Sequence, residues 1–227
     1  MRDHLSLPTV LLSGAVALMA SVTAFGQNLV TNPGFELPPD TTTNVDNTVT
    51  GWNLLLDTSR AQFYNHTPGA LPAAQGGGWS LWLKTFEAAG GGATQDVPVV
   101  AGQPYTLTAQ MLFEPSYPNI PGIDTFLQLQ FKDGGTAVGS PDVLHILPTA
   151  VTADKTWSPF SITGTAPAGA TQVEAEIGWA NGSAVPGQQG AFADDVTLTT
   201  IPEPASLCLI SVCGAALLIR RRNARLA

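Results

Sequence analysis

Cysteine is nearly absent from this chain of 227 residues. The two cysteines, Cys208 and Cys213, both lie in an apolar run close to the C-terminus. The rest of the chain therefore has no cysteine that could form a disulfide, act as a thiol nucleophile or bind a metal. Its stability must come from a hydrophobic core, alone or together with a bound metal.

Positive charge is also scarce. Lys and Arg total 9 against 17 Asp and Glu, so the formal net charge at pH 7 is −8. Between residues 27 and 200 the only basic side chains are these four: Arg60, Lys84, Lys132 and Lys155. Phosphate groups and anionic membrane surfaces would repel such an acidic domain, so we predict no nucleic-acid partner. Calcium and neutral glycans are more compatible partners.

The residue patterns of common catalytic sites are missing from residues 27–200. His66 and His145 are too far apart in the sequence for a metal-ligand motif, and no Gly-x-Ser-x-Gly motif occurs. The glycine triplets lack the Lys-Ser/Thr pair of a phosphate-binding loop. Glu174 and Glu176 share one face of an expected strand, a pattern more typical of a solvated sheet than of a glycosidase carboxylate pair. We predict that the protein is not an enzyme.

The N-terminus has the pattern of a secretory signal. Arg2 precedes a run dominated by apolar residues from 5 to 24, and Ala24 and Gly26 place small residues where a signal peptidase reads them. We predict that residues 1–26 are a signal peptide cleaved after Gly26. The alternative is a second membrane anchor, and either version exports the middle of the chain.

The C-terminus carries a second uncharged run, from Ala205 to Ile219. As a helix these residues would span about 22 Å, short of a hydrocarbon core of about 30 Å. A proline-rich triplet precedes the run and an arginine cluster follows it: Pro202, Glu203, Pro204 and Arg220, Arg221, Arg222. By the positive-inside rule the arginines keep the C-terminal end of the helix in the cytoplasm.

This arrangement resembles the PEP-CTERM sorting signal of exopolysaccharide-producing Gram-negative bacteria. The resemblance implies that an exosortase recognises Pro202-Glu203-Pro204 and removes the tail. Residues 201–227 would then form a short transmembrane helix that anchors the protein transiently in the inner membrane. The mature protein would reach the cell surface or the extracellular matrix. A generic tail anchor is the alternative.

Residues 27–200 have a dominant period of two. Apolar and polar residues alternate along Tyr105 to Phe113, Ile123 to Phe131 and Val173 to Trp179, which predicts strands with one buried face. Shorter strand candidates are Asn28 to Thr31, Gly51 to Leu55, Ala61 to Tyr64, Trp79 to Lys84, Thr94 to Val97, Val143 to Leu147, Trp157 to Thr163 and Phe192 to Thr199. Expected turns fall at Gly76 to Gly78, Gly90 to Gly92, Asp133 to Gly135 and Pro167 to Gly169. We predict one all-β domain, a two-sheet antiparallel sandwich.

Three segments give this domain a family resemblance. The opening Asn28 to Glu36, the pair Gly51-Trp52 and the closing Ala191 to Leu198 resemble carbohydrate-binding modules of the family 4 and 9 type. The resemblance implies a galactose-binding-like jelly roll. It also implies extracellular polysaccharide as a partner.

In related modules a structural calcium ion lies where the first and last strands meet. The resemblance therefore assigns Glu36 and Asp194 as calcium ligands, with Asp195 as a further candidate. Asp194 shares its parity with three apolar residues of the last strand: Phe192, Val196 and Leu198. An inward carboxylate without a counter-ion is costly, and calcium prefers such oxygen ligands. The alternatives are a solvated edge acid or a carboxylate that caps backbone amides.

One tryptophan is predicted to face outward. Trp52 and Trp179 are expected in the core, whereas Leu81 and Leu83 set the buried phase around Trp82 and leave it exposed. An outward ring beside amide groups suits sugar recognition. The predicted ligand-binding set is Trp82, Gln110, Gln128 and Gln130, with Tyr64 and Tyr117 as secondary candidates. A loop that covers Trp82 is the alternative.

Two functions remain open at this point. The first is a non-catalytic carbohydrate-binding module that engages exopolysaccharide. The second is a structural matrix protein in which the sandwich is a scaffold that binds no sugar. An exposed aromatic platform in a groove favours the first, and a covered Trp82 on a flat polar surface favours the second.

Overall fold

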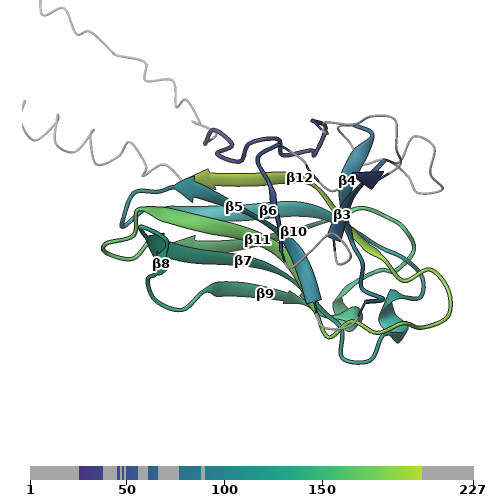
Figure 1. Cartoon of the computed structure of the whole chain (residues 1–227). Helices are drawn as coiled ribbons and strands as arrows, with labels where there is room; N and C mark the ends of the chain where they lie inside the picture. Colours follow the sequence, from purple (N-terminus) through teal and green to yellow (C-terminus); the bar gives the residue numbers. More distant parts are fainter. Residues whose placement is uncertain are drawn as a thin grey trace, which may run out of the picture.

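Two antiparallel β-sheets pack face to face in the computed structural model of the chain (Figure 1). The structure describes residues 26–37, 45–46, 48, 50–55, 61–65, 77–87 and 90–200. The predicted all-β sandwich is confirmed. The predicted sorting tail and all of the predicted signal peptide except Gly26 lie outside the described residues. Within the described ranges, no helix is long and apolar enough to cross a membrane.

The first sheet has the strand order β1-β3-β4-β12-β6-β10, and each neighbouring pair is antiparallel. Its strands are β1 (Val45–Asp46), β3 (Ala61–Asn65), β4 (Trp79–Leu83), β6 (Pro104–Phe113), β10 (Ser158–Thr165) and β12 (Ala191–Thr200). The last strand therefore lies in the middle of the sheet, between β4 and β6.

The second sheet has the order β2-β5-β11-β7-β8, and β9 also pairs with β7. Its strands are β2 (Asn53–Leu55), β5 (Gly90–Pro98), β7 (Asp124–Asp133), β8 (Thr136–Ala137), β9 (Asp142–Ile146) and β11 (Gln172–Ala180). Two short 3-10 helices, Tyr117–Asn119 and Pro148–Ala150, lie in the connections around this sheet. In Figure 1, β9 runs along the edge next to β7.

Alternation of apolar residues accounts for the long strands. Leu107, Ala109 and Met111 of β6 are fully buried, as are Leu127 and Leu129 of β7. Their intervening neighbours are partly exposed on the outer faces of the sandwich. Trp52 and Trp179 are buried as predicted, at 6% and 1% exposure. The core therefore fills the space between the sheets, and each sheet has an outer face available for other contacts.

Two segments differ from the sequence prediction. Gly90 to Gly92 were expected in a turn, but they open β5, where they pair with the end of β11. The strand expected at Asn28 to Thr31 is irregular, although Leu29 N–H donates a hydrogen bond to the Leu198 carbonyl at 2.8 Å. That bond brings the start of the domain alongside its last strand.

A β-bulge in β12 changes which face its residues point to. The register with β6 shifts between Asp194 and Thr197, and Asp195 has a positive φ of 47°. Before the bulge Ala193 faces the core and Phe192 faces outward. After it Val196 joins the core. The prediction that Phe192 shares the inward face of Val196 is therefore wrong, because an extra residue reverses the alternation.

Candidate functional site

The outer face of the first sheet carries a cluster of rings around Trp82, which faces outward as predicted. The Trp82 ring lies parallel to that of Phe192 at 6.1 Å between centroids, and edge to face with that of Tyr64 at 5.7 Å. Phe86 approaches to 5.8 Å, and Lys84 Nζ lies 5.4 Å from the Trp82 ring centroid. The outer-face cluster consists of Tyr64, Trp82, Leu112, Trp157 and Phe192.

Trp82 is largely engaged by these neighbours. Its indole Nε1 is buried and has no hydrogen-bond partner among the described residues. A Cβ placed on Gly190 would lie only 2.7 Å from that nitrogen, so the chain just before β12 packs against the indole edge. The structure therefore favours the alternative in which Trp82 is covered.

Tyr117 has a packing role rather than a place on the surface. Its side chain is fully buried, and its hydroxyl shares a 2.8 Å hydrogen bond with Thr125 Oγ1. Burial raises the pKa of Tyr117 to about 12. The prediction that Tyr117 contacts a ligand is contradicted by this burial, because its hydroxyl lies between Thr125 of β7 and the Ile146 carbonyl of β9.

The three predicted glutamines do not come together. Gln110 lies on β6, on the outer face of the first sheet, opposite Asp194 and Pro159. Gln128 and Gln130 lie on β7, in the second sheet. Trp82 and Gln128 therefore face opposite sides of the molecule, and one ligand cannot contact both.

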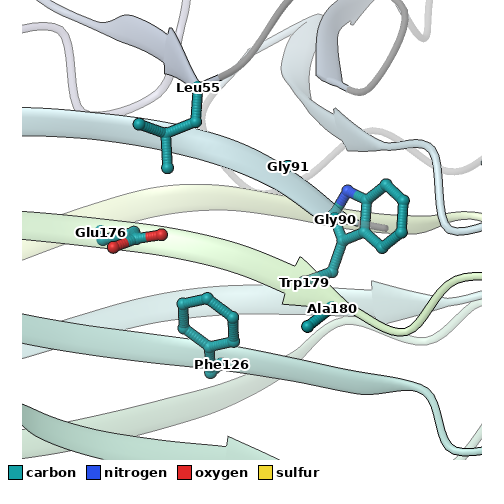
Figure 2. Close-up of a pocket in the computed structure, with 7 residues that line it drawn as sticks. All are labelled: Leu55, Gly90, Gly91, Phe126, Glu176, Trp179 and Ala180. Carbon is teal, nitrogen blue, oxygen red and sulfur yellow. The ribbon is translucent and has the colours of Figure 1, made fainter. Parts of the chain in front are cut away.

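A hollow of about 390 Å³ lies on the outer face of the second sheet (Figure 2). Its lining comes from β2, β5, β7 and β11: Leu55, Gly90, Gly91, Phe126, Glu176, Trp179 and Ala180. Figure 2 shows Leu55 and Phe126 on opposite sides of the hollow, with Glu176 between them at one end. The lining is mostly apolar and contains one carboxylate.

The Phe126 ring lies across the neighbouring strand because that strand has a glycine at the contact. Phe126 is paired with Gly178 in the register of β7 and β11. A Cβ on Gly178 would lie 2.6 Å from Cζ and 2.8 Å from Cε2 of Phe126. Any larger residue would lift the ring off the sheet, so Gly178 sets its orientation.

Glycines also let β5 approach β11 closely under the hollow. A Cβ on Gly92 would lie 2.3 Å from the Ile177 carbonyl oxygen, and one on Gly90 would lie 2.6 Å from that of Trp179. Since glycines have no side chain, nothing covers the sheet surface at these positions between Leu55 and Phe126. The hollow exists because these residues have no Cβ atoms.

Glu176 supplies the polar side of the hollow. Its Oε2 accepts a 2.8 Å hydrogen bond from Gln128 Nε2, and a Cβ on Gly178 would lie 3.0 Å from Oε1. Oε1 therefore lies beside the Phe126 ring. Burial, reinforced by the charge of Glu174 and opposed by Lys132, raises the pKa of Glu176 to about 7. This arrangement can accept hydrogen bonds from a ligand whose apolar face rests on the ring.

Sequence reasoning missed Phe126 as a site residue although two signals were present. Phe126 has the outward parity of Gln128, and a glycine stands in the outward phase of the strand that pairs with it. The pairing of β7 with β11 could not be inferred from either strand alone.

Gln130, one of the predicted ligand-binding glutamines, is less available to a ligand, because its Nε2 donates to the Phe131 carbonyl at 2.8 Å.

The three predicted calcium ligands lie close together near Gly34. A Cβ on Gly34 would lie 3.5 Å from Cγ of Glu36, 3.7 Å from Oδ1 of Asp194 and 4.0 Å from Oδ1 of Asp195. Glu36 Oε1 accepts from Trp79 N–H at 2.8 Å, and Asp194 Oδ1 accepts from Asp195 N–H at 2.7 Å. Across the described residues, no group of three His, Cys, Asp or Glu side chains is arranged to hold a metal ion.

Asp194 is buried at 1% exposure, and it takes no part in the ion pairs found among the described residues. Burial, together with the charges of Asp195 and Glu36, raises the pKa of Asp194 to about 8 despite the hydrogen bond from Asp195 N–H. The donors suit a hard cation chemically. As they stand, their side chains alone do not complete a coordination shell.

The fold defines a jelly-roll-like β-sandwich, and solved structures share it. The enzymatically active domain of tailspike protein 4 of bacteriophage CBA120 matches 77% of this chain at a TM-score of 0.53 and 15% identity. This chain covers only 21% of the tailspike chain. No family model matches the sequence, and no curated protein matches it either.

Carbohydrate-binding modules are among the matching structures. TmCBM61, solved with beta-1,4-galactotriose, matches 77% of this chain and 99% of its own length at a TM-score of 0.50 and 18% identity. A family 16 carbohydrate-binding module matches 76% of this chain and 99% of its own length, with a TM-score of 0.44 and 19% identity. At 18% identity, the likeness to TmCBM61 shows a shared jelly-roll-like fold.

Proposed function

We propose that the protein is a non-catalytic carbohydrate-binding module that holds a neutral saccharide in the hollow of the second sheet. The observation that carries this proposal is the Phe126 ring, which lies over Gly178 with the carboxylate of Glu176 at its edge. The apolar face of a sugar ring can stack on the phenyl group. Its hydroxyls can donate to Glu176.

The surroundings of the hollow support a neutral ligand. Glu176 and Glu174 both lie on the outer face of β11, and the nearby cation Lys132 is already paired with Glu174 at 2.7 Å. A uronic acid would bring further negative charge to this face. The fold is also shared with a module that was solved with a neutral trisaccharide.

Affinity electrophoresis tests the proposal. Residues 27–200 are run through gels that contain β-1,4-galactan, xylan, mixed-linkage β-glucan or arabinan. We expect at least one gel to retard the wild type, and Phe126→Ala to remove the retardation. Gln110→Ala, on the opposite sheet, is the matched control and should behave as the wild type. No retardation in any gel would support the scaffold function instead.

The same samples test the absence of catalysis. Overnight incubation with each polysaccharide should release no new reducing ends. Release that is lost in Glu176→Gln would show that Glu176 has a catalytic role and would overturn the non-catalytic part of the proposal.

We also propose the cellular location that the two ends of the chain indicate. The protein is exported, an exosortase-like enzyme removes the tail that anchors it transiently in the inner membrane, and the mature protein reaches the cell surface or the extracellular matrix of a Gram-negative bacterium. Mass spectrometry of the surface protein should find neither residues 1–26 nor residues 220–227. Mature protein that still contains Arg220 to Arg222 would contradict the sorting proposal.

Calcium is proposed as a structural ion at Glu36 and Asp194, with Asp195 as a further ligand. The support is that Oδ1 of Asp194 and Oδ1 of Asp195 lie near Gly34, together with Cγ of Glu36. Backbone carbonyls would have to supply the remaining ligands. An ion present at 100 times its Kd would stabilise the fold by about 2.7 kcal/mol. Adding calcium to chelator-treated protein should therefore raise Tm by several degrees, and Asp194→Ala should remove the shift. An equal shift in Asp194→Ala would exclude this site.

A further inference from the structure

Phe126 has an exposed histidine on the side away from the hollow. In the register of β7 with β9, Phe126 lies directly opposite His145, just as it lies opposite Gly178 on β11. Side chains of directly opposed residues in antiparallel strands point to the same face. His145 therefore stands on the outer face of the second sheet, next to the proposed platform.

The imidazole of His145 is held in place by Asp124. His145 Nδ1 lies 2.7 Å from Asp124 Oδ2, while 57% of the His145 side chain is exposed. With Nδ1 held by a carboxylate, Nε2 is left for a hydrogen bond with a ligand hydroxyl, as an acceptor in the neutral ring and as a donor in the protonated ring. An oriented hydrogen-bonding nitrogen thus lies on the far side of Phe126 from the hollow.

The placement of Asp124 lowers the stability of the fold. Its second oxygen, Oδ1, is buried and accepts no hydrogen bond from the residues that the structure describes. A buried acceptor without a partner destabilises the fold, so such a group in a native structure calls for an explanation. Holding the His145 ring at the edge of the platform provides one.

We propose that His145 and Asp124 form a second contact point for the saccharide, so that the ligand is a chain of several sugar units running across β11, β7 and β9. This inference rests on the proposed function of the hollow. Two inter-strand steps separate β11 from β9, about 10 Å in all, which is more than one sugar ring spans. His145 contacts a hydroxyl of a unit beyond the one stacked on Phe126, and Asp124 is a positioning residue.

Chain length is the variable that tests this arrangement. The polysaccharide that retards the wild type most in the four-gel panel is hydrolysed to oligosaccharides of one to four units. Calorimetry then measures their affinity for the wild type, His145→Ala, Asp124→Asn and Phe126→Ala. We expect His145→Ala to weaken binding of the three- and four-unit ligands about tenfold and to leave binding of the one-unit ligand unchanged. Asp124→Asn should follow the same length dependence with a smaller loss, and Phe126→Ala should weaken every length.

The outcomes separate this inference from the proposed function. If no polysaccharide retards the wild type, both fail. If Phe126→Ala abolishes binding but His145→Ala matches the wild type at every length, the inference alone is overturned. An equal loss for all lengths in His145→Ala would also overturn it, because that pattern indicates a general structural effect. Should His145→Ala melt well below the wild type, His145→Gln replaces it, and the same length dependence is required.

Discussion

The two outer faces of the sandwich use aromatic side chains in opposite ways. On the first sheet, the Trp82, Tyr64 and Phe192 rings pack against one another, with centroids 5.6 to 6.1 Å apart. On the second, Phe126 lies across Gly178 and lines an open hollow. Rings that contact other rings stabilise the fold, whereas a ring supported by a glycine keeps a face for a ligand. The number of aromatic residues on a face therefore does not identify the binding face.

The polar groups follow the same division. Near Trp82 the charged side chains are Lys84, which lies over the ring, and Glu114, whose Oε2 accepts a hydrogen bond from Gly190 N–H. Near Phe126 the polar groups are Glu176, bridged to Gln128, and His145, which pairs with Asp124. On the second face these polar groups surround a ring that lines an open hollow, whereas on the first face the ring is packed against other rings. Substitutions on the two faces should therefore separate stability from binding.

The largest expected effect is a loss of stability in Trp82→Ala. Removing a ring that packs against Tyr64, Phe86 and Phe192 should cost about 3 kcal/mol of unfolding free energy. Urea denaturation measures this loss, and Trp82→Phe should recover part of it. Retardation by polysaccharide should not change below the unfolding transition. If binding fell while stability did not, Trp82 would be the platform that the sequence indicated and the two faces would exchange roles.

The second effect is a loss of binding in Phe126→Ala. Replacing an aromatic anchor with alanine typically weakens binding by about 2 kcal/mol, roughly thirtyfold in affinity. Because the ring is partly exposed, unfolding free energy should fall by less than about 1 kcal/mol. Calorimetry with the best-retained polysaccharide and urea denaturation give the two numbers. A large loss of stability with unchanged affinity would show that Phe126, like Trp82, stabilises the fold and does not bind the ligand.

The sequence was sufficient to predict the fold class and the long strands, because period-two alternation is a local property. Val173 to Trp179 and Tyr105 to Phe113 were predicted within one or two residues of β11 and β6. The buried phase at Leu81 and Leu83 was also correct, and it placed Trp82 outward.

The candidate site was harder to predict because it depends on which strands are neighbours. Trp82 is covered by Phe192 from β12, and the phase of β12 is reversed at the bulge near Asp195, which alternation cannot show. Gly90 to Gly92 were predicted to form a turn because glycine triplets usually form one. Here they let two strands approach closely. Phe126 becomes a platform only because Gly178 is its partner across the sheet.

The third prediction concerns pH and the charge at the hollow. The pKa of Glu176 in the folded protein is raised to about 7 from an ordinary value of 4.5. A raised carboxyl pKa means that the folded state binds the proton more tightly, so stability falls as pH rises from about 4.5 to 7 and then levels off. Glu176→Gln removes this dependence and can still accept from Gln128.

We therefore expect Glu176→Gln to be as stable as the wild type near pH 4. Above pH 7 it should be more stable by about 1 to 2 kcal/mol, a discounted value for a partly exposed group. Urea denaturation at pH 4, 5.5 and 8 measures the difference. Glu174→Gln is the control, since Glu174 pairs with Lys132 and its replacement should not stabilise the protein at pH 8. Equal curves for the wild type and Glu176→Gln at all three pH values would show that the carboxylate is solvated.

The smallest expected change is the most specific, because Gly178→Ala keeps the Phe126 and Glu176 side chains and alters the surface on which they rest. The added methyl group would meet Cζ and Cε2 of Phe126 at 2.6 and 2.8 Å, so the ring must tilt away from the strand. Alanine loses less backbone entropy than glycine on folding, which offsets the disturbance, and stability should change by less than about 1 kcal/mol. Affinity for the best-retained polysaccharide should fall about tenfold, close to 1.4 kcal/mol.

A double-mutant cycle with Phe126→Ala decides the mechanism. If Gly178 acts through the ring, adding Gly178→Ala to Phe126→Ala should cost no further affinity. Additive losses would mean that Gly178 contacts the ligand itself and that the hollow's floor, rather than the ring, determines binding.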